Sequence, residues 1–223
     1  MISNRKNNLY PIIVFGASGH ALSVANVAIS AGYKIAYFVD KNKKTDYLLG
    51  IKIIVDISEL DDTNNYEYCI AVGDNALRER IYNDLMKKYV GIKFPPLIHQ
   101  SAVISSFSSI GDGTVVMPNA TVGPNSTIGK FCIINTQSSV DHECNMMDFS
   151  SLAPNASTGG AVKIGYRSAI SIGAVVKQGL QIGDDSILGA NSYLNKNLTN
   201  NKVAYGTPAK EVRVRKIGDE YLK

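Results

Sequence analysis

The stretch SSVDHECNMM, residues 138–147, places a histidine between two acids without a helical period or a metal-ligand spacing. His142 has Asp141 on one side and Glu143 on the other. A neutral imidazole can accept a proton near neutral pH, and a neighbouring carboxylate can hydrogen-bond its ring. The local sequence therefore allows a general base, and equally an exposed histidine without a role. The elements that position His142 have to be considered next.

A period of six residues runs through the chain around His142. Of the seventeen residues at every sixth position from Ile98 to Leu194, sixteen are apolar, and a small residue usually stands two positions earlier. An α-helix, with 3.6 residues per turn, would scatter this pattern around its circumference. Short strands with glycine or polar residues at tight corners satisfy the period, and stacked coils share one core. The pattern predicts a three-sided β-helix in which Cys132 and Cys144 fill space and His142 lies at an outward corner.

The residues before the repeats carry an α/β pattern. YPIIVFGASGHALSVANVAISAGYKIAYFVD predicts a strand, a glycine turn, a helix and a second strand that ends at Asp40. YEYCIAVG predicts another strand, followed by a helix from about residue 76 that Asp74 or Asn75 would cap. GIKFPPLIH, residues 91–99, is expected as a further strand. The first helix is expected to carry an apolar set made of Leu22, Val24, Val27, Ala28 and Ile29.

Three loops of this α/β region are candidates for a ligand site. The turn at residues 16–20 offers free backbone N–H groups at a helix N-terminus, where a phosphate group fits. It lacks the third glycine of the dinucleotide-binding motif, so the motif alone is a weak indication. The loops at residues 16–20, 40–41 and 73–75 follow strands, and we expect them to meet in one crevice.

Composition limits the partners and the compartment. Lys and Arg exceed Asp and Glu by 23 to 19, too small an excess for a nucleic-acid surface, so we expect no nucleic-acid partner. The first apolar run ends at Gly16 after about four residues, too short for a signal peptide or for membrane insertion. Three cysteines without a CxxC pair argue against a disulfide framework and favour a reducing, cytoplasmic location.

The six-residue pattern over residues 98–196 resembles the hexapeptide-repeat acyltransferases, whose repeats form a left-handed parallel β-helix, and AYGTPAKEVR resembles the segment that ends their helix. With FGASGHA, FVD and AVGDN before VDHEC, the whole chain is similar to the bacterial nucleotide-sugar N-acetyltransferases. The resemblance implies a Rossmann-like α/β domain over residues 1–95 that binds a nucleotide sugar. It also implies a left-handed β-helix domain over residues 96–223 and a homotrimer.

The resemblance further implies a reaction. In the nearest group, acetyl-CoA donates its acetyl group to the 4-amino group of a UDP-4-amino-4,6-dideoxy-N-acetyl-hexosamine, giving UDP-N,N′-diacetylbacillosamine. We expect direct transfer without an acyl-enzyme and without a metal. Sialic-acid O-acetyltransferases and GDP-perosamine N-acetyltransferases share the same layout and remain alternatives, as does a non-catalytic, nucleotide-sugar-binding structural trimer. Zinc carbonic anhydrases of this fold need three histidines from the repeats, whereas the three here are His20, His99 and His142, and only the last lies well inside the repeats.

The site residues that the resemblance implies fall into three groups. His142 matches the family's catalytic base, and Glu143 would hydrogen-bond and orient it. The implied nucleotide-sugar contacts are Ser18, Gly19, His20, Asp40, Lys41 and Gly73. The implied acetyl-CoA contacts are Ser151, Gly160, Ile172 and Ala190, where Ser151 stands in place of a histidine of the bacillosamine-type enzymes and Ala190 in place of a glycine.

The period supplies a separate argument for a trimer. His142 and Gly160 are eighteen residues apart, three repeats, so they lie on one edge of a three-sided coil. Ile172 and Ala190 are also eighteen apart and lie on another edge. One extended ligand that touches both edges fits most easily in a groove between two subunits, which agrees with the homotrimer.

Overall fold

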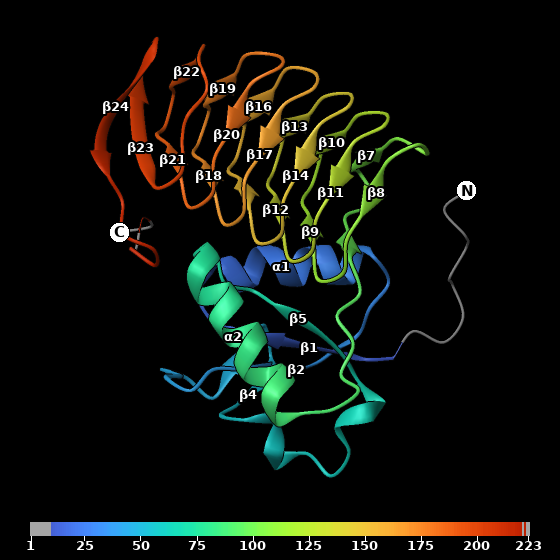
Figure 1. Cartoon of the computed structure of the whole chain (residues 1–223). Coiled ribbons are helices and arrows are strands. Elements are labelled where there is room, and N and C mark those ends of the chain that lie inside the picture. Colours follow the sequence, from blue (N-terminus) through green and yellow to red (C-terminus); the bar gives the residue numbers. More distant parts are fainter. Residues whose placement is uncertain (1–9, 220, 222–223) are drawn as a thin grey trace.

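In the computed structural model, which describes residues 10–219 and 221, a small α/β unit lies against one side of a three-sided coil of short strands (Figure 1). The sheet of the α/β unit has the strand order β3-β4-β2-β1-β5 and is parallel except for the β3–β4 hairpin. Its strands are β1 Ile12–Phe15, β2 Ile35–Val39, β3 Tyr47–Leu48, β4 Ile51–Ile54 and β5 Glu67–Ile70. The helices are α1, Gly19–Ser30, and α2, Asn75–Lys88, with short 3-10 turns at Ile57–Glu59 and Thr63–Asn65.

The segment at residues 91–99 differs from its prediction. It does not form a strand of the α/β sheet, because only Lys93 pairs there, in a single bridge with Glu67. Pro95 and Pro96 follow, and neither has an N–H group to donate to a sheet. The chain then enters the coil as β6, Leu97–Ile98. The hairpin of β3 and β4 was not predicted.

Helix α1 buries Val24, Val27 and Ala28 of the predicted apolar set, together with Ala21 and Ala25. Of the predicted apolar set, Leu22 is 42% exposed and Ile29 is 56% exposed. The buried residues include Ala21, Ala25 and Ala28, whose spacing places them on one stripe of the helix, where their small side chains allow close approach. One side packs on the α/β sheet and the other on the coil, so α1 joins the two regions in one core. The residues buried in α1 are Ala21, Val24, Ala25, Val27 and Ala28, and those of the coil are Leu97, Val115 and Met117.

The coil is a three-sided parallel β-helix whose two-residue strands recur every six residues. Sheet I consists of β7 (Val103–Ile104), β10 (Thr121–Val122), β13 (Ser139–Val140), β16 (Ser157–Thr158), β19 (Val175–Val176) and β22 (Tyr193–Leu194). Sheet II consists of β8 (Ser109–Ile110), β11 (Thr127–Ile128), β14 (Asn145–Met146), β17 (Lys163–Ile164) and β20 (Gln181–Ile182). Sheet III begins with β6 and continues with β9 (Val115–Val116), β12 (Ile133–Ile134), β15 (Ser151–Leu152), β18 (Ala169–Ile170) and β21 (Ile187–Leu188).

The core of the β-helix is the predicted one. The second residue of each strand points inward, and the free thiols of Cys132 and Cys144 fill the narrow inward positions beside them. The corners differ from the prediction in part. Left-handed backbone recurs every six residues from position 113 to position 191, and besides glycine and polar residues it includes Phe131 and Phe149. The glycines that directly follow strands serve close stacking instead, since a Cβ at Gly165 would lie 2.5 Å from the carbonyl carbon of Gly183 in the next coil.

Arg78 of α2 fixes the α/β unit on the β-helix. Its side chain is fully buried, and its Nε and Nη2 atoms donate to the carbonyl oxygens of Phe131 and Phe149 at 2.8 and 2.9 Å. Nη1 donates to the carbonyls of Val72 and Gly73 at 2.9 and 3.0 Å. One guanidinium group therefore holds the loop after β5 at a set distance from sheet III.

The C-terminal end of the β-helix is closed by a hairpin. Strand β23, Lys202–Gly206, extends sheet III by pairing with β21, and β24, Ala209–Val214, folds back antiparallel to it. The chain then returns toward α2 (Figure 1). Among the described residues, neither α1 nor α2 is long and apolar enough to cross a bilayer.

Candidate active site

His142 lies at the corner that follows β13, with 53% of its side chain exposed. Its Nδ1 atom is 2.9 Å from Oε2 of Glu143, the contact expected from the sequence. Asp141 does not reach the ring: its Oδ1 atom accepts from the backbone N–H of His142 at 2.8 Å. The two flanking acids thus have separate tasks, and Nε2 is the ring nitrogen left for a substrate.

Gly160, one coil further along the same edge, makes room for the His142 ring. A Cβ at this position would lie 2.3 Å from Nε2 and 2.4 Å from Cε1 of His142. The coils are held in register there by the N–H of Ala161, which donates to the carbonyl of His142 at 2.8 Å. The absence of a side chain at Gly160 is therefore a condition for the ring's position.

The loops that follow β1 and β2 are tied to each other through Asp40. Its Oδ2 atom accepts from the N–H of Ala17 at 3.1 Å and its Oδ1 atom from the N–H of Asn42 at 2.9 Å. Ser18 begins α1 without a side-chain cap, and the first turn contains no acid. The first N–H groups of α1 are thus left to bind an anion such as a phosphate.

A cavity of about 430 Å³ lies between the segments that follow β1 and β5 on one side and sheet III on the other. It brings together three of the predicted nucleotide-sugar contacts and three of the predicted acetyl-CoA contacts: Ser18, His20, Gly73, Ser151, Ile172 and Ala190. Gly19, Asp40 and Lys41 are not among the residues that line it. His142, Glu143 and Gly160 are also outside it, because they lie at the corners between sheets I and II, whereas Ile172 and Ala190 lie at the corners between sheets III and I.

His20 is a neutral polar group at the cavity wall. Burial, helped by the nearby positive charge of Arg78, lowers the pKa of His20 to about 4. Its Nε2 atom is buried without a hydrogen-bond partner among the described residues. A buried polar nitrogen of this kind is stabilised when a ligand supplies the missing partner.

Two family models match the two halves of this arrangement: the PglD N-terminal domain over residues 11–85 and the bacterial transferase hexapeptide (six repeats) over residues 96–142. GDP-perosamine N-acetyltransferase of Escherichia coli is 31% identical over 111 residues, which cover 50% of this chain and 49% of that enzyme. The chain therefore matches about half the length of this curated relative.

Solved structures extend the match over nearly the whole chain. A variant of perosamine N-acetyltransferase from Caulobacter crescentus, in complex with CoA and GDP-perosamine, is 30% identical with a TM-score of 0.85, covering 91% of this chain and 97% of that one. The chain belongs to the hexapeptide-repeat nucleotide-sugar N-acetyltransferase family. A further member, the acetyltransferase domain of PglB from Neisseria gonorrhoeae in complex with acetyl coenzyme A, is 30% identical with a TM-score of 0.86, covering 92% of this chain and 100% of that one. The predicted family and the predicted fold class, a Rossmann-like α/β domain followed by a left-handed parallel β-helix, are confirmed.

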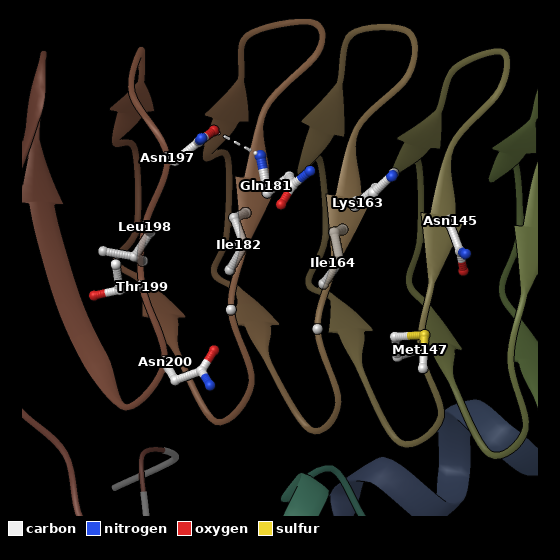
Figure 2. A pocket seen from close by; sticks show the side chains of 12 residues that line it. Asn145, Met147, Lys163, Ile164, Gln181, Ile182, Asn197, Leu198, Thr199 and Asn200 are labelled. Carbon is white, nitrogen blue, oxygen red and sulfur yellow. Dashed lines mark hydrogen bonds between the residues drawn. The ribbon is translucent and has the colours of Figure 1, made fainter.

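A second groove, larger than this cavity at about 640 Å³, crosses sheet II (Figure 2). Asn145, Lys163 and Gln181 project from successive strands along it, and the Gln181 N–H donates to Oδ1 of Asn197 at 2.9 Å. None of the predicted site residues lines this groove. Within the described part of the chain, no group of three or more His, Cys, Asp or Glu residues could hold a metal ion.

Two residues that the sequence did not predict, Arg78 and Tyr221, help to form the cavity and its surroundings. Arg78 looks like any basic residue of an amphipathic helix, and only the docked β-helix reveals why its side chain is buried. Tyr221 lines the cavity although it lies seventy residues after Ser151 in the sequence and belongs to no motif. No sequence signal marks either residue.

Proposed function

We propose that this protein is an acetyl-CoA-dependent N-acetyltransferase acting on the 4-amino group of a nucleotide-activated 4-amino-4,6-dideoxy sugar. The observation that carries the proposal is the His142–Glu143 pair, in which Glu143 engages Nδ1 at 2.9 Å and Nε2 remains for the substrate. Glu143 fixes the tautomer with the proton on Nδ1, so that Nε2 is the proton acceptor. The relatives with bound CoA support acetyl-CoA as the donor.

In the proposed reaction the neutral amine attacks the carbonyl carbon of the acetyl thioester. As the tetrahedral intermediate forms, Nε2 of His142 takes the proton that the new amide nitrogen has to lose. A backbone N–H near the following coil would stabilise the oxyanion. Collapse of the intermediate expels the CoA thiolate, which the imidazolium can protonate, and the histidine returns to its neutral form.

For the acceptor we propose UDP-4-amino-4,6-dideoxy-N-acetylglucosamine, on the similarity of the FGASGHA, FVD, AVGDN and VDHEC segments to the bacillosamine-type enzymes. GDP-perosamine is the second candidate, favoured by the two perosamine acetyltransferases among the relatives. In either case residues 1–95 would hold the nucleotide, with the phosphates at the N-terminus of α1 and Ser18, Gly19, His20, Asp40, Lys41 and Gly73 around it. Ser151, Gly160, Ile172 and Ala190 would contact acetyl-CoA.

We also propose that the active enzyme is a homotrimer whose subunits meet through sheet I. The outward residues of sheet III are all buried, and sheet II carries Lys163, whereas the outward residues of sheet I are all uncharged. Sheet I is bordered on one side by the edge with His142 and on the other by the edge with Ile172 and Ala190. Three copies with sheet I toward a common axis would bring the His142 edge of one copy beside the cavity of the next. The outward residues of sheet I are Val103, Thr121, Ser139, Ser157, Val175 and Tyr193.

The test is release of the CoA thiol from acetyl-CoA with four acceptors: UDP-4-amino-4,6-dideoxy-N-acetylglucosamine, its C4 epimer, GDP-perosamine and free sialic acid. We expect rapid turnover of one amino sugar and, in His142→Ala, a loss of about 10²–10⁴-fold in kcat with an unchanged oligomer. A kcat close to that of the wild type in this variant would contradict the mechanism. Activity on sialic acid alone would indicate the O-acetyltransferase, and no activity on any acceptor would favour the non-catalytic binding protein.

The compartment we propose is the cytoplasm. The support is that Cys69, Cys132 and Cys144 are all free and buried. Burial raises the pKa of Cys132 to about 11, which keeps this thiol protonated and unreactive at neutral pH.

A further inference from the structure

The segment after β24 is anchored between the β-helix and α2. Arg215 is 2% exposed, and its Nη1 atom donates to the carbonyl of Asp185 at 3.1 Å and lies 3.7 Å from the carboxylate of the same residue. Its Nη2 atom donates to the carbonyl of Asp219, whose side chain in turn accepts from the N–H of Lys216 at 3.0 Å. Asp185 also pairs with Arg167, so the anchor belongs to a charge network on the β-helix.

This anchored segment directs Tyr221 into the wall of the cavity. The Tyr221 hydroxyl donates to the carbonyl oxygen of Gly73 at 3.3 Å, and Tyr221 lines the cavity together with Ser151. The Arg215 guanidinium lies over the ring at 5.4 Å from its centroid. Tyr221 thus contacts Gly73, a predicted nucleotide-sugar contact, and lines the same cavity as Ser151, a predicted acetyl-CoA contact.

Tyr221 lines the cavity without filling it, because about 430 Å³ of space remains with the ring in place. Burial raises the pKa of its hydroxyl, so the phenol is neutral and can both donate and accept a hydrogen bond. Sugar hydroxyl and amide groups present the complementary donors and acceptors, and an aromatic ring offers an apolar face to a sugar ring.

We propose that Tyr221 is a substrate-contacting residue that binds the sugar of the nucleotide-sugar acceptor, held in position by the Arg215–Asp185 pair. The inference rests on the proposed function and adds to it a residue from a segment that follows the β-helix. Its position between Gly73 and Ser151 places it where the acceptor would lie beside the coenzyme. If Tyr221 had only a structural role, it would stabilise the position of this segment, and its removal would not change the affinity for the acceptor.

The experiment compares the wild type with Tyr221→Phe, Tyr221→Ala and the control Ile217→Ala, whose side chain is 67% exposed on the same segment and does not line the cavity. We expect KM for the amino-sugar acceptor to rise about tenfold in Tyr221→Ala and about threefold in Tyr221→Phe. KM for acetyl-CoA and the melting temperature should stay close to the wild-type values, and Ile217→Ala should match the wild type. An unchanged acceptor KM in Tyr221→Ala would overturn the inference, as would a lowered melting temperature with no change in KM.

The failure of this inference is separable from that of the proposed function. Turnover by the wild type tests the function, whereas the KM split between acceptor and acetyl-CoA tests Tyr221. If the wild type acetylates none of the acceptors, calorimetric titration with the same nucleotide sugars replaces the KM measurement. Loss of nucleotide-sugar affinity in Tyr221→Ala, but not in Ile217→Ala, would then still support the contact, and equal affinities would refute it.

Discussion

Two edges of the β-helix carry the residues of the proposed site. One edge uses residues that are adjacent in the sequence, and the other uses residues from distant segments. The edge between sheets I and II holds His142 and Glu143, which are adjacent in the sequence, exposed, and joined by one hydrogen bond. The edge between sheets III and I borders a cavity assembled from segments far apart in the sequence, including His20, Gly73 and Tyr221. The reactive group is thus local, whereas the binding site depends on the docking of the whole α/β unit.

Under the proposed function, neither edge would be sufficient alone. His142 has a preorganised ring but borders no cavity among the described residues, and the cavity contains no residue placed to act as a general base on an amine except the buried His20. The low pKa of His20 makes it a weak base. A site shared between copies resolves this, because one copy would supply the base and the next copy the cavity.

The largest expected effect comes from separating the two edges by mutation. His142→Ala removes the base, and Ile172→Glu places a negative charge where the anionic coenzyme is proposed to bind. We expect each homomeric variant to lose at least about a hundredfold in activity. In mixed trimers from a one-to-one coexpression, about a quarter of the sites would combine an intact His142 from one copy with an intact cavity from the next. Activity per subunit should therefore recover to about a quarter of the wild-type value.

The control for this experiment pairs two variants of the same edge, Ile172→Glu with Ala190→Glu. Their mixture should regain far less activity than the mixture that combines the two edges. Equal activities of the two mixtures, or no recovery in either, would show that each subunit contains a complete site and would refute the shared arrangement.

The same contrast explains what the sequence could predict of the fold. The six-residue period placed every strand of the β-helix from β6 to β22, because each repeat has to bury the same apolar position. Each element of the α/β unit occurs only once, so an error in predicting one element is not corrected by the pattern of the others. Leu22 and Ile29 are as apolar as the residues that α1 buries, yet both are exposed. The Pro95–Pro96 pair was the available signal that residues 91–99 do not form one strand.

In the proposed site, too, the local contacts could be predicted from the sequence and the distant ones could not. The His142–Glu143 contact could be expected because both residues belong to one corner, and the cap of α2 by Asp74, whose Oδ1 atom accepts from Leu77 N–H at 2.9 Å, is equally local. Arg78 and Tyr221 could not be found in this way. Their roles arise from contacts across 53 and 148 residues of sequence, to Phe131 and Gly73, which no local pattern encodes.

A second prediction tests the base edge by itself. In Gly160→Ala the new methyl group would lie 2.3 Å from Nε2, so the His142 ring has to turn away from its position over the next coil. Because a displacement of about 1 Å can cost about a hundredfold in rate, we expect kcat to fall by about ten- to a hundredfold. KM for the nucleotide sugar should change little, since the cavity is on the other edge.

The matched control for this variant is Gly179→Ala in the next coil. A Cβ there meets nothing within 4 Å, and although Gly179 has a positive φ of 72°, Ala161 adopts φ 57° at the equivalent corner. Its kcat should remain within about twofold of the wild-type value. A Gly160→Ala enzyme that keeps its kcat and loses only nucleotide-sugar affinity would assign Gly160 to binding instead.

The smallest effect concerns the cavity edge and its stability at low pH. The folded protein lowers the pKa of His20 from 6.5 to about 4, so between these values the unfolded chain takes up a proton that the folded chain rejects. Above pH 6.5 the residue is neutral in both states and contributes no difference. As the pH falls toward 5, this one group should reduce the free energy of unfolding by about 2 kcal/mol. In His20→Gln that contribution is absent, so the drop in melting temperature between pH 7.5 and pH 5.0 should be smaller than in the wild type. Equal drops in the two proteins would show that His20 is accessible to protons in the folded state, and the cavity edge would then be as open as the edge that carries His142.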